Sequence, residues 1–384
     1  MKKPWCTEPF NTIENAVWGQ WGLCCRSTRL PYNAKDVSPL EHFNSDIMKQ
    51  VRRDMLEHKM SDDIQRLCQK CIKHEADGNI SMRQDRLEYD QTPYRSIQSA
   101  IDNDGEIKDF AFRSVEIKFF GNLCNLQCKM CGPTYSSSIA ATQKKDGTYD
   151  GPVHVNVFAD MQTSDQEKLY KDLEQIIPNT HQIKFTGGEP MMNKGIEEMV
   201  QWIVDKGYNK STQITIITNG TKVNHNLLEL CSKFKQFLIR LSLDGVWDIN
   251  DYQRVGADFN DINSNISEYK RYTDHICIDC TVTAISVNGL AELGTYVQMK
   301  ELAINFSSIA LHPNYLQIKV LPIPYRNKLI EKYSNPAFNA VVFRKPEEVI
   351  IALQDPEWNE DLWKLFLEKN PDIVDVIPDL KEYI

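Results

Sequence analysis

The chain has 384 residues, of which 41% are hydrophobic and 10% aromatic, a composition typical of a soluble globular protein with two or three domains. Its formal net charge of −9 disfavours a general nucleic-acid binder, which usually has a basic footprint, although a local basic groove is not excluded. The N-terminal sequence lacks the apolar stretch of a signal peptide, and no apolar run is long enough to span a membrane, so we expect a cytoplasmic protein. Eleven cysteines in such a chain indicate metal ligation more than disulfides.

Residues 1–112 are rich in cysteine and show little strand periodicity, with one predicted helix over residues 44–57. Two cysteines of this region form a CxxC motif. Four thiolates together would close a four-iron cluster with no open iron, or they would bind a structural zinc ion as in a zinc ribbon. The candidate ligands are Cys6, Cys24, Cys68 and Cys71, with Cys25 as an alternative to Cys24.

From residue 113 to 321, short β-rich runs alternate with helical stretches, which is typical of βα units and a parallel sheet. A helix over residues 195–208 has apolar residues at helical spacing and would cover the sheet, whereas residues 145–163 are turn-rich. Six strands are enough for a partial barrel or an open α/β sheet. The predicted strands are 115–120, 182–186, 213–218, 237–243, 276–283 and 308–311.

Three cysteines in the run GNLCNLQCKMC, residues 121–131, follow the first of these strands with the spacing CxxxCxxC. Three thiolates on a four-iron cluster leave one iron open to a small molecule, which makes it a place for chemistry. A structural zinc site would need a fourth ligand, and the nearest candidates in the sequence are Cys71 and His154. The three cysteines are Cys124, Cys128 and Cys131.

The second strand ends in FTGGEP, residues 185–190. Two glycines allow backbone N–H and C=O groups to approach a ligand closely, and Glu189 offers a carboxylate to an ammonium group. Ligands of parallel α/β proteins bind at this end of the strands. Taken alone, the motif is also compatible with an ordinary turn between a strand and a helix.

CxxxCxxC after one strand and GGEP after the next together resemble the radical S-adenosylmethionine (SAM) superfamily. The resemblance implies a partial (β/α)6 barrel that holds a [4Fe–4S] cluster on Cys124, Cys128 and Cys131, with SAM chelating the fourth iron. It assigns Gly187, Gly188 and Glu189 to the methionine amino group. Met130 stands where an aromatic residue is common, and its backbone is expected near the adenine.

The resemblance extends to two further strand ends. Asn219 in TNG, and Ser242 and Asp244 in LSLDG, match positions that reach the ribose and carboxylate of SAM in similar enzymes. Arg254 matches an arginine that follows this motif in many relatives. It would either meet a carboxylate or brace the loop.

The N-terminal cysteines resemble the SPASM and twitch modules of peptide-modifying radical SAM enzymes, although most such modules follow the barrel. The resemblance implies a second, auxiliary [4Fe–4S] cluster, favours Cys24 over Cys25, and includes the positions Glu75, Gly78, Ser81 and Arg83. Zinc is the alternative. We therefore predict an auxiliary-cluster domain over 1–112, a radical SAM core over 113–321 and a C-terminal extension over 322–384, whose helical tail packs on the barrel.

The implied activity is reductive cleavage of SAM to a 5′-deoxyadenosyl radical that abstracts a hydrogen from the substrate. An auxiliary cluster would suit oxidative modification of a peptide or protein, with electrons from a donor such as flavodoxin or ferredoxin. The alternatives are epimerisation or rearrangement of a small molecule, or a zinc or iron–sulfur binding protein without SAM turnover. No catalytic acid, base or hydrogen-atom donor is assigned.

Three other cysteines are predicted to be structural. Cys277 and Cys280 are three residues apart on a predicted strand, so their side chains point to opposite faces and would not share a metal. Cys231 lies in an apolar helical pattern. His312, at the end of the last strand, is a weak candidate for the active site against the commoner case of a locally hydrogen-bonded histidine.

Overall fold

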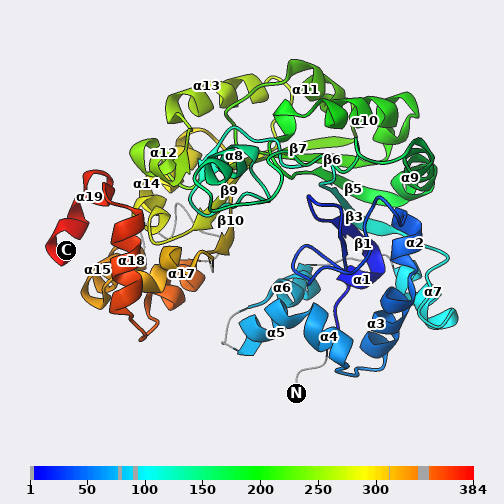
Figure 1. Ribbon diagram of the computed structural model, residues 1–384, viewed down its shortest axis with the longest axis horizontal. Coiled ribbons are helices and arrows are strands. Elements are labelled where there is room, and N and C mark those ends of the chain that lie inside the picture. The colour runs from blue at the N-terminus through cyan, green and yellow to red at the C-terminus, as the bar shows by residue number, and fades with distance from the viewer. Residues whose placement is uncertain (1–3, 77–79, 90–93, 311, 336–345) are drawn as a thin grey trace. The chain divides into compact units, whose positions relative to one another are not determined.

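The computed structural model describes residues 4–76, 80–89, 94–310, 312–335 and 346–384 (Figure 1). Its main sheet has eight strands in the order β10-β9-β7-β6-β5-β3-β1-β2, and the C-terminal part is helical. This confirms the predicted α/β class with a partial TIM-type barrel.

The chain divides into two compact units. The first consists of residues 1–124, 150–216 and 226–237, and the second of residues 125–149, 217–225 and 238–384. Both units therefore contain parts of the predicted core. The division at residues 112 and 321 stays a prediction.

In the first unit, parallel strands follow one another through βα connections. β3 (Phe112–Ile117) pairs with β5 (Thr180–Phe185), which pairs with β6 (Gln213–Thr218), whose last two residues belong to the second unit. The last of these has the predicted bounds, and the other two begin two or three residues earlier than predicted. α9 (Thr163–Ile176) precedes β5, and α10 (Lys194–Asp205) follows it.

α10 confirms the predicted helix over 195–208. Its buried residues recur every three or four positions, which places them on one face of the helix. They are Ile196, Met199, Val200 and Ile203.

The N-terminal segment adds two strands that the sequence did not reveal. β1 (Thr12–Asn15) pairs parallel with β3, and β2 (Trp21–Gly22) pairs antiparallel with β1. All four residues of β1 are buried, so the strand has no polar–apolar alternation to detect. Buried Glu14 contacts Lys118 and Arg29, and the ion pair with Lys118 links β1 to the end of β3.

Helices surround these short strands. α3 (Asp46–Leu56) confirms the helix predicted over 44–57. The other helices of this segment are α1 (Glu8–Asn11), α2 (Pro39–Phe43), α4 (Asp62–Leu67), α5 (Gln69–Ala76), α6 (Met82–Tyr89) and α7 (Tyr94–Asp102).

The second unit contains β7 (Gln236–Ser242), which begins at the boundary between the units, β9 (Ile276–Val282) and β10 (Ala303–Ile309), paired in parallel. These match the predicted strands, except that β10 begins earlier and Leu311 lies outside the described residues. A separate two-stranded antiparallel sheet joins β4 (Gln127–Cys128) to β8 (Arg254–Val255).

Several helices connect or follow these strands. Between α8 (Ser137–Lys145) and α9 the chain forms turns and irregular structure, as predicted for 145–163. The other helices outside the N-terminal segment are α11 (His225–Ser232), α12 (Trp247–Gln253), α13 (Phe259–Tyr269) and α14 (Leu290–Met299).

The C-terminal part consists of α15 (Ile323–Ser334), α17 (Pro346–Leu353), α18 (Glu360–Lys369) and α19 (Ile373–Val376). α18 buries Trp363 and Phe366 and contacts the short 3-10 turns between residues 314 and 320, so the tail is an amphipathic helix packed on the same unit. Among the described residues, no helix is both long and apolar enough to cross a membrane.

Candidate active site

Within the first unit, the GGE motif is hydrogen-bonded to the start of the cysteine loop. The backbone N–H of Gly188 donates to the carbonyl of Gly121 at 3.0 Å, and that of Glu189 donates to the carbonyl of Leu123 at 2.6 Å. A Cβ on Gly188 would lie 2.3 Å from the Leu123 oxygen, so no larger residue fits without a backbone shift. The two motifs are therefore brought together by backbone contacts that require glycine.

The conformation of the motif also depends on its other residues. Gly187 has a φ of +135°, which L-residues with a side chain rarely adopt. Glu189 is only 2% exposed, and its carboxylate accepts a hydrogen bond from the backbone N–H of Met191 at 3.0 Å. This bond caps the short 3-10 turn Pro190–Met192 and fixes the orientation of the carboxylate.

The rest of the cysteine loop lies in the second unit and is held from one side by β8. Cys128 pairs in register with Arg254, and the backbone N–H of Lys129 donates to the carbonyl of Gln253 at 2.9 Å. Cys124, Cys128 and Met130 are half-buried, whereas Cys131 is exposed. Among the described residues, no cysteine is in a disulfide.

Asn219, at the end of β6, is tied to the same loop. Its side-chain amide donates to the side-chain oxygen of Asn125 at 3.1 Å, and its own oxygen accepts from the backbone N–H of Thr221 at 2.9 Å. Asn219 is 7% exposed. It therefore helps to position the residue that directly follows Cys124.

Asp244 and Arg254 form a buried ion pair near the middle cysteine. The Asp244 carboxylate accepts from the backbone N–H of Thr281 at 2.7 Å and lies 2.8 Å from the Nε of Arg254. The Nη1 of Arg254 is 4.0 Å from the Sγ of Cys128. Arg254 thus contacts a carboxylate, that of Asp244, and also lies beside the cysteine loop, so its role stays a prediction. Ser242, at the end of β7, is half-buried.

Burial and neighbouring charges oppose each other at Arg254. Burial lowers the pKa of its guanidinium, but Asp244 and then Cys128 raise it, and the net pKa lies above the usual value. Arg254 is therefore a fixed positive charge beside the Cys128 sulfur. Spacing in the sequence gives no signal for this contact, because 126 residues separate the two.

The N-terminal cysteines gather within the first unit. Cys6 is buried, and Cys24, Cys68 and Cys71 are half-buried. Burial raises the pKa of Cys6 and Cys24 well above the usual value and that of Cys68 to about 11. After burial and Glu8, the charges of Cys68 and Cys71 raise the pKa of Cys6, and the charges of Cys25, Glu8 and Cys6 raise that of Cys24.

Arg83 connects two segments of this cysteine set. Its guanidinium donates to the carbonyl of Trp5, next to Cys6, and to the carboxylate of Glu75 on the CxxC helix α5, both at 3.0 Å. Ser81 also donates to Glu75, at 2.6 Å. Gly78 lies outside the described residues.

Among the described residues, no group of three or more His, Cys, Asp or Glu side chains is arranged to bind a single metal ion. A four-iron cluster makes a different geometric demand, since each thiolate binds its own corner iron.

The remaining candidates lie apart from these contacts. Cys231 and Cys280 are fully buried, as predicted for structural thiols, and Cys277 is half-buried. His312 is exposed and precedes a cis peptide bond to Pro313.

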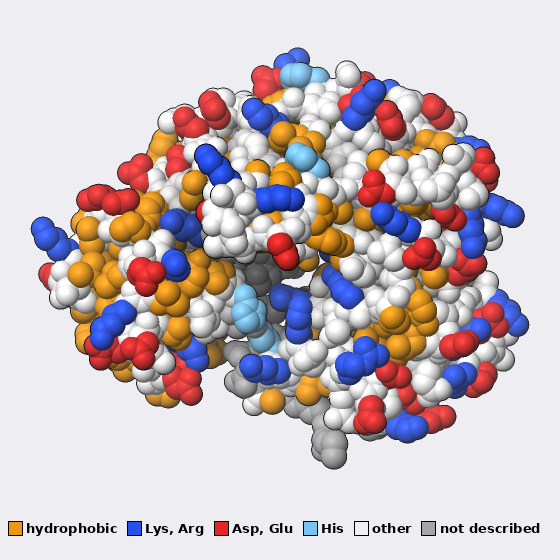
Figure 2. All heavy atoms as spheres, viewed as in Figure 1, with side chains coloured by type: hydrophobic (Ala, Val, Ile, Leu, Met, Phe, Trp, Pro, Cys, Tyr) orange, Lys and Arg blue, Asp and Glu red, His pale blue; other side chains and the backbone are white. Residues whose placement is uncertain are grey.

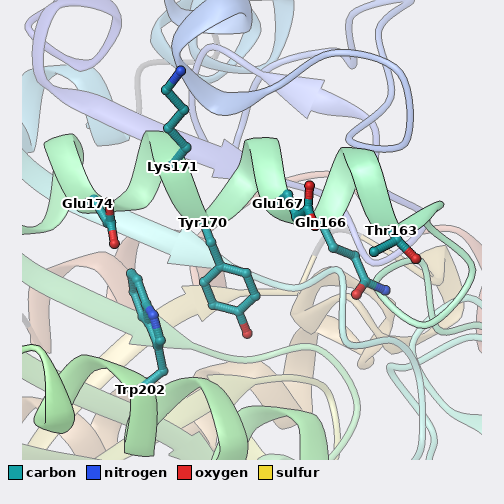
Figure 3. Close-up of a pocket in the computed structure, with 7 residues that line it drawn as sticks. All are labelled: Thr163, Gln166, Glu167, Tyr170, Lys171, Glu174 and Trp202. Atoms are coloured by element: carbon teal, nitrogen blue, oxygen red, sulfur yellow. The ribbon is translucent and has the colours of Figure 1, made fainter.

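A hollow of about 400 Å³ lies between α9 and α10 (Figure 3). Tyr170 and Trp202 meet in it edge to face with ring centroids 4.8 Å apart, and none of the predicted site residues lines it. The hollow is therefore not formed by the residues that carry the motifs.

On the face of the molecule shown in Figure 2, acidic and basic side chains are interspersed.

Comparison with known proteins finds one family model that matches the part of the chain carrying the motifs. Residues 119–289 match the family model described as the radical SAM superfamily. This range includes all three loop cysteines, the GGE motif and LSLDG.

Individual similarities are partial. A 7,8-dihydro-6-hydroxymethylpterin dimethyltransferase of Methanocaldococcus jannaschii is 28% identical over 33% of this chain and 21% of its own length. A GTP 3′,8-cyclase of Campylobacter fetus is 27% identical over 31% of this chain and 30% of its own length. The chain thus spans between 21% and 30% of the length of these two relatives. The solved structure of native anSMEcpe with bound AdoMet matches 60% of this chain and 63% of that one, with 21% identity and a TM-score of 0.44.

Proposed function

We propose that this protein is a radical SAM enzyme whose cluster is bound by Cys124, Cys128 and Cys131. The observation that carries the proposal is the hydrogen bonding of Gly188 and Glu189 to Gly121 and Leu123, inside the region that matches the superfamily model. A thiolate donor set and an adjacent glycine backbone fit a cluster with one open iron and an amino-acid ligand on it.

Different residues of the protein would bind the cluster and the separate parts of SAM. The three thiolates bind iron, and the GGE backbone and the Glu189 carboxylate face the methionine amino group. Asn219, Ser242 and Asp244 contact the ribose and carboxylate of SAM, or they position the loops that make these contacts. Met130 contributes backbone near the adenine. When bound, the reduced cluster and SAM supply a 5′-deoxyadenosyl radical that abstracts a hydrogen atom from the substrate.

For the N-terminal cysteines we propose an auxiliary [4Fe–4S] cluster on Cys6, Cys24, Cys68 and Cys71. The effect of Cys68 and Cys71 on the pKa of Cys6, the effect of Cys6 on the pKa of Cys24, and the contacts of Arg83 support it. Because burial raises the pKa of Cys6, Cys24 and Cys68, binding iron to these three thiols would release protons. Zinc at the same four thiols is the competing occupant.

The proposed reaction is oxidation of a peptide or protein. Flavodoxin or ferredoxin would supply the electron for SAM cleavage, and an auxiliary cluster would accept the electron that the substrate loses, together with a proton, after its hydrogen atom has been abstracted. The support is the resemblance of the N-terminal cysteines to SPASM and twitch modules. Redox-neutral chemistry on a small molecule is the second candidate for the substrate step.

The test is anaerobic reconstitution of the full chain with iron and sulfide, followed by reduction in the presence of SAM. We expect 5′-deoxyadenosine from the wild type, none from Cys128→Ala, and wild-type amounts from Cys277→Ala, which removes a thiol not assigned to iron. Absence of 5′-deoxyadenosine from a fully loaded wild type would contradict the enzyme proposal.

The substrate class can be tested separately. A deuterated cell extract is divided into a peptide fraction and a small-molecule fraction, and each is added to the reduced enzyme with SAM. Deuterium in 5′-deoxyadenosine from the peptide fraction supports the peptide proposal, and deuterium from the other fraction alone overturns it.

A further inference from the structure

We infer that Arg254 donates an N–H to the thiolate of Cys128 and thereby sets the reduction potential of the cluster on the cysteine loop. The inference rests on the proposed function, because it concerns the cluster placed there. It assigns Arg254 a positioning and electrostatic role toward a ligand sulfur.

The first support is geometric. Cys128 and Arg254 are paired residues of the two-stranded β4–β8 sheet, which fixes their backbones opposite one another. From there the Nη1 of Arg254 comes within 4.0 Å of the Cys128 Sγ, which is hydrogen-bond distance for a sulfur acceptor. The backbone bond from Lys129 to Gln253 reinforces the same register.

The second support is the fixed position of the charge. Arg254 is 7% exposed and Asp244 is fully buried, so water does not screen the guanidinium effectively. Asp244 is itself anchored by the backbone N–H of Thr281. The Nε of Arg254 contacts Asp244 as an ion pair at 2.8 Å, and Nη1 is on the sulfur side of the guanidinium.

The third support is the chemistry of sulfur ligands. Hydrogen bonds to cluster sulfurs and the net charge around them are among the factors that set cluster potentials. Reduction adds negative charge to the cluster. A buried cation that donates to a ligand sulfur therefore stabilises the reduced form and raises the potential, which favours accepting the electron that SAM cleavage requires.

The test is an EPR-monitored redox titration of the reconstituted full-length protein without SAM. The relevant signal is the one that Cys128→Ala removes. We expect Arg254→Met to shift the equilibrium between reduced and oxidised cluster about tenfold toward the oxidised form, or about 59 mV for a one-electron couple. Arg254→Lys keeps the charge but not the planar donor and should give a smaller shift in the same direction.

Arg240→Met is the matched control, since it removes another ion-paired arginine of the same unit that contacts Asp279 at 2.5 Å. Its potential should equal that of the wild type. An unchanged potential in Arg254→Met overturns the inference. If that variant fails to load iron, an unchanged potential in Arg254→Lys does so instead.

The titration also distinguishes the inferred role of Arg254 from a role in SAM binding and from failure of the proposed function. If Arg254 variants weaken SAM binding but leave the SAM-free potential unchanged, the arginine serves the SAM carboxylate and the inference is wrong. If the wild type loads a cluster and produces 5′-deoxyadenosine while the potentials agree, only the role of Arg254 fails. If no cluster forms on the loop of the wild type, the proposed function fails first.

Discussion

The two cysteine sets are held in different ways. Cys124, Cys128 and Cys131 lie within eight residues on one loop and range from half-buried to exposed. The N-terminal set comes from three separate segments and includes the buried Cys6, and burial raises the pKa of Cys6, Cys24 and Cys68. The exposed Cys131 suits a site that exchanges a small molecule, and the less exposed N-terminal set suits a permanent occupant, as open and closed zinc sites illustrate.

The two sets also differ in what supports them. Backbone hydrogen bonds from the GGE motif and from Gln253 hold the cysteine loop. Side-chain contacts made by Arg83 connect the N-terminal segments. The loop should therefore be sensitive to added bulk at Gly188, whereas the N-terminal set should be sensitive to loss of the Arg83 side chain.

The largest effect is expected from removing ligands of one set at a time. Cys68→Ala/Cys71→Ala should lose about four of about eight iron atoms per chain and still cleave SAM, because each [4Fe–4S] cluster carries its own four irons. Cys128→Ala should keep the N-terminal cluster and lose SAM cleavage. Iron analysis with a 5′-deoxyadenosine assay measures both, and equal iron loss with complete inactivity in both variants would show that the sets are interdependent.

The next effect concerns Arg83. Arg83→Met leaves Glu75 buried without its cation, and breaking a buried pair in this way typically costs about 3–5 kcal/mol. We expect loss of the N-terminal iron with retention of iron on the cysteine loop, measured by iron content and Mössbauer spectra. The control Arg66→Met breaks the exposed pair with Asp63 on the neighbouring helix and should change neither. Full N-terminal iron in Arg83→Met would contradict the connecting role.

Gly188→Ala tests the backbone support of the cysteine loop. Its new Cβ meets a backbone oxygen that cannot move independently, and such overpacking usually costs about 1–3 kcal/mol. We expect weaker SAM binding and a lower urea midpoint. Gly132→Ala is the matched control in the same loop region, because its Cβ would meet nothing within 4 Å. Equal stability and SAM affinity in the two variants would count against the close approach.

The smallest effect is a pH dependence on the N-terminal side. His42 is fully buried against Trp21 of β2, with ring centroids 4.9 Å apart. Burial, and secondarily Arg52, lower the pKa of His42 from 6.5 to about 3. The unfolded chain therefore binds this proton below about pH 6.5 and the folded chain does not, so stability falls as pH drops from 6.5 toward 3.

Between pH 7 and pH 5 the His42 contribution amounts to about 2 kcal/mol. Urea unfolding at the two pH values should show this loss in the wild type and a smaller one in His42→Phe. The same slope in both proteins would mean that other groups cause the acid sensitivity.

Prediction from sequence was most accurate where the signal was local. β6 and α10 carry their apolar residues at the spacing of a strand and a helix, and the structure has them at or near the predicted bounds. β1 was missed because it is short and buried on both sides, and only its pairing with β3 makes it a strand. The predicted ligand sets and SAM contacts stay predictions.

The amino-acid sequence by itself determined the two cysteine spacings, the GGE motif and the βα succession, since each depends on residues that are close in the chain. Only the tertiary structure decided which residues from distant parts of the chain contact these motifs. Arg254 reaches Cys128 because β8 pairs with β4, and Arg83 reaches Trp5 because α6 folds back beside the N-terminal segment. Such contacts depend on packing between segments up to 126 residues apart, and no local periodicity encodes them.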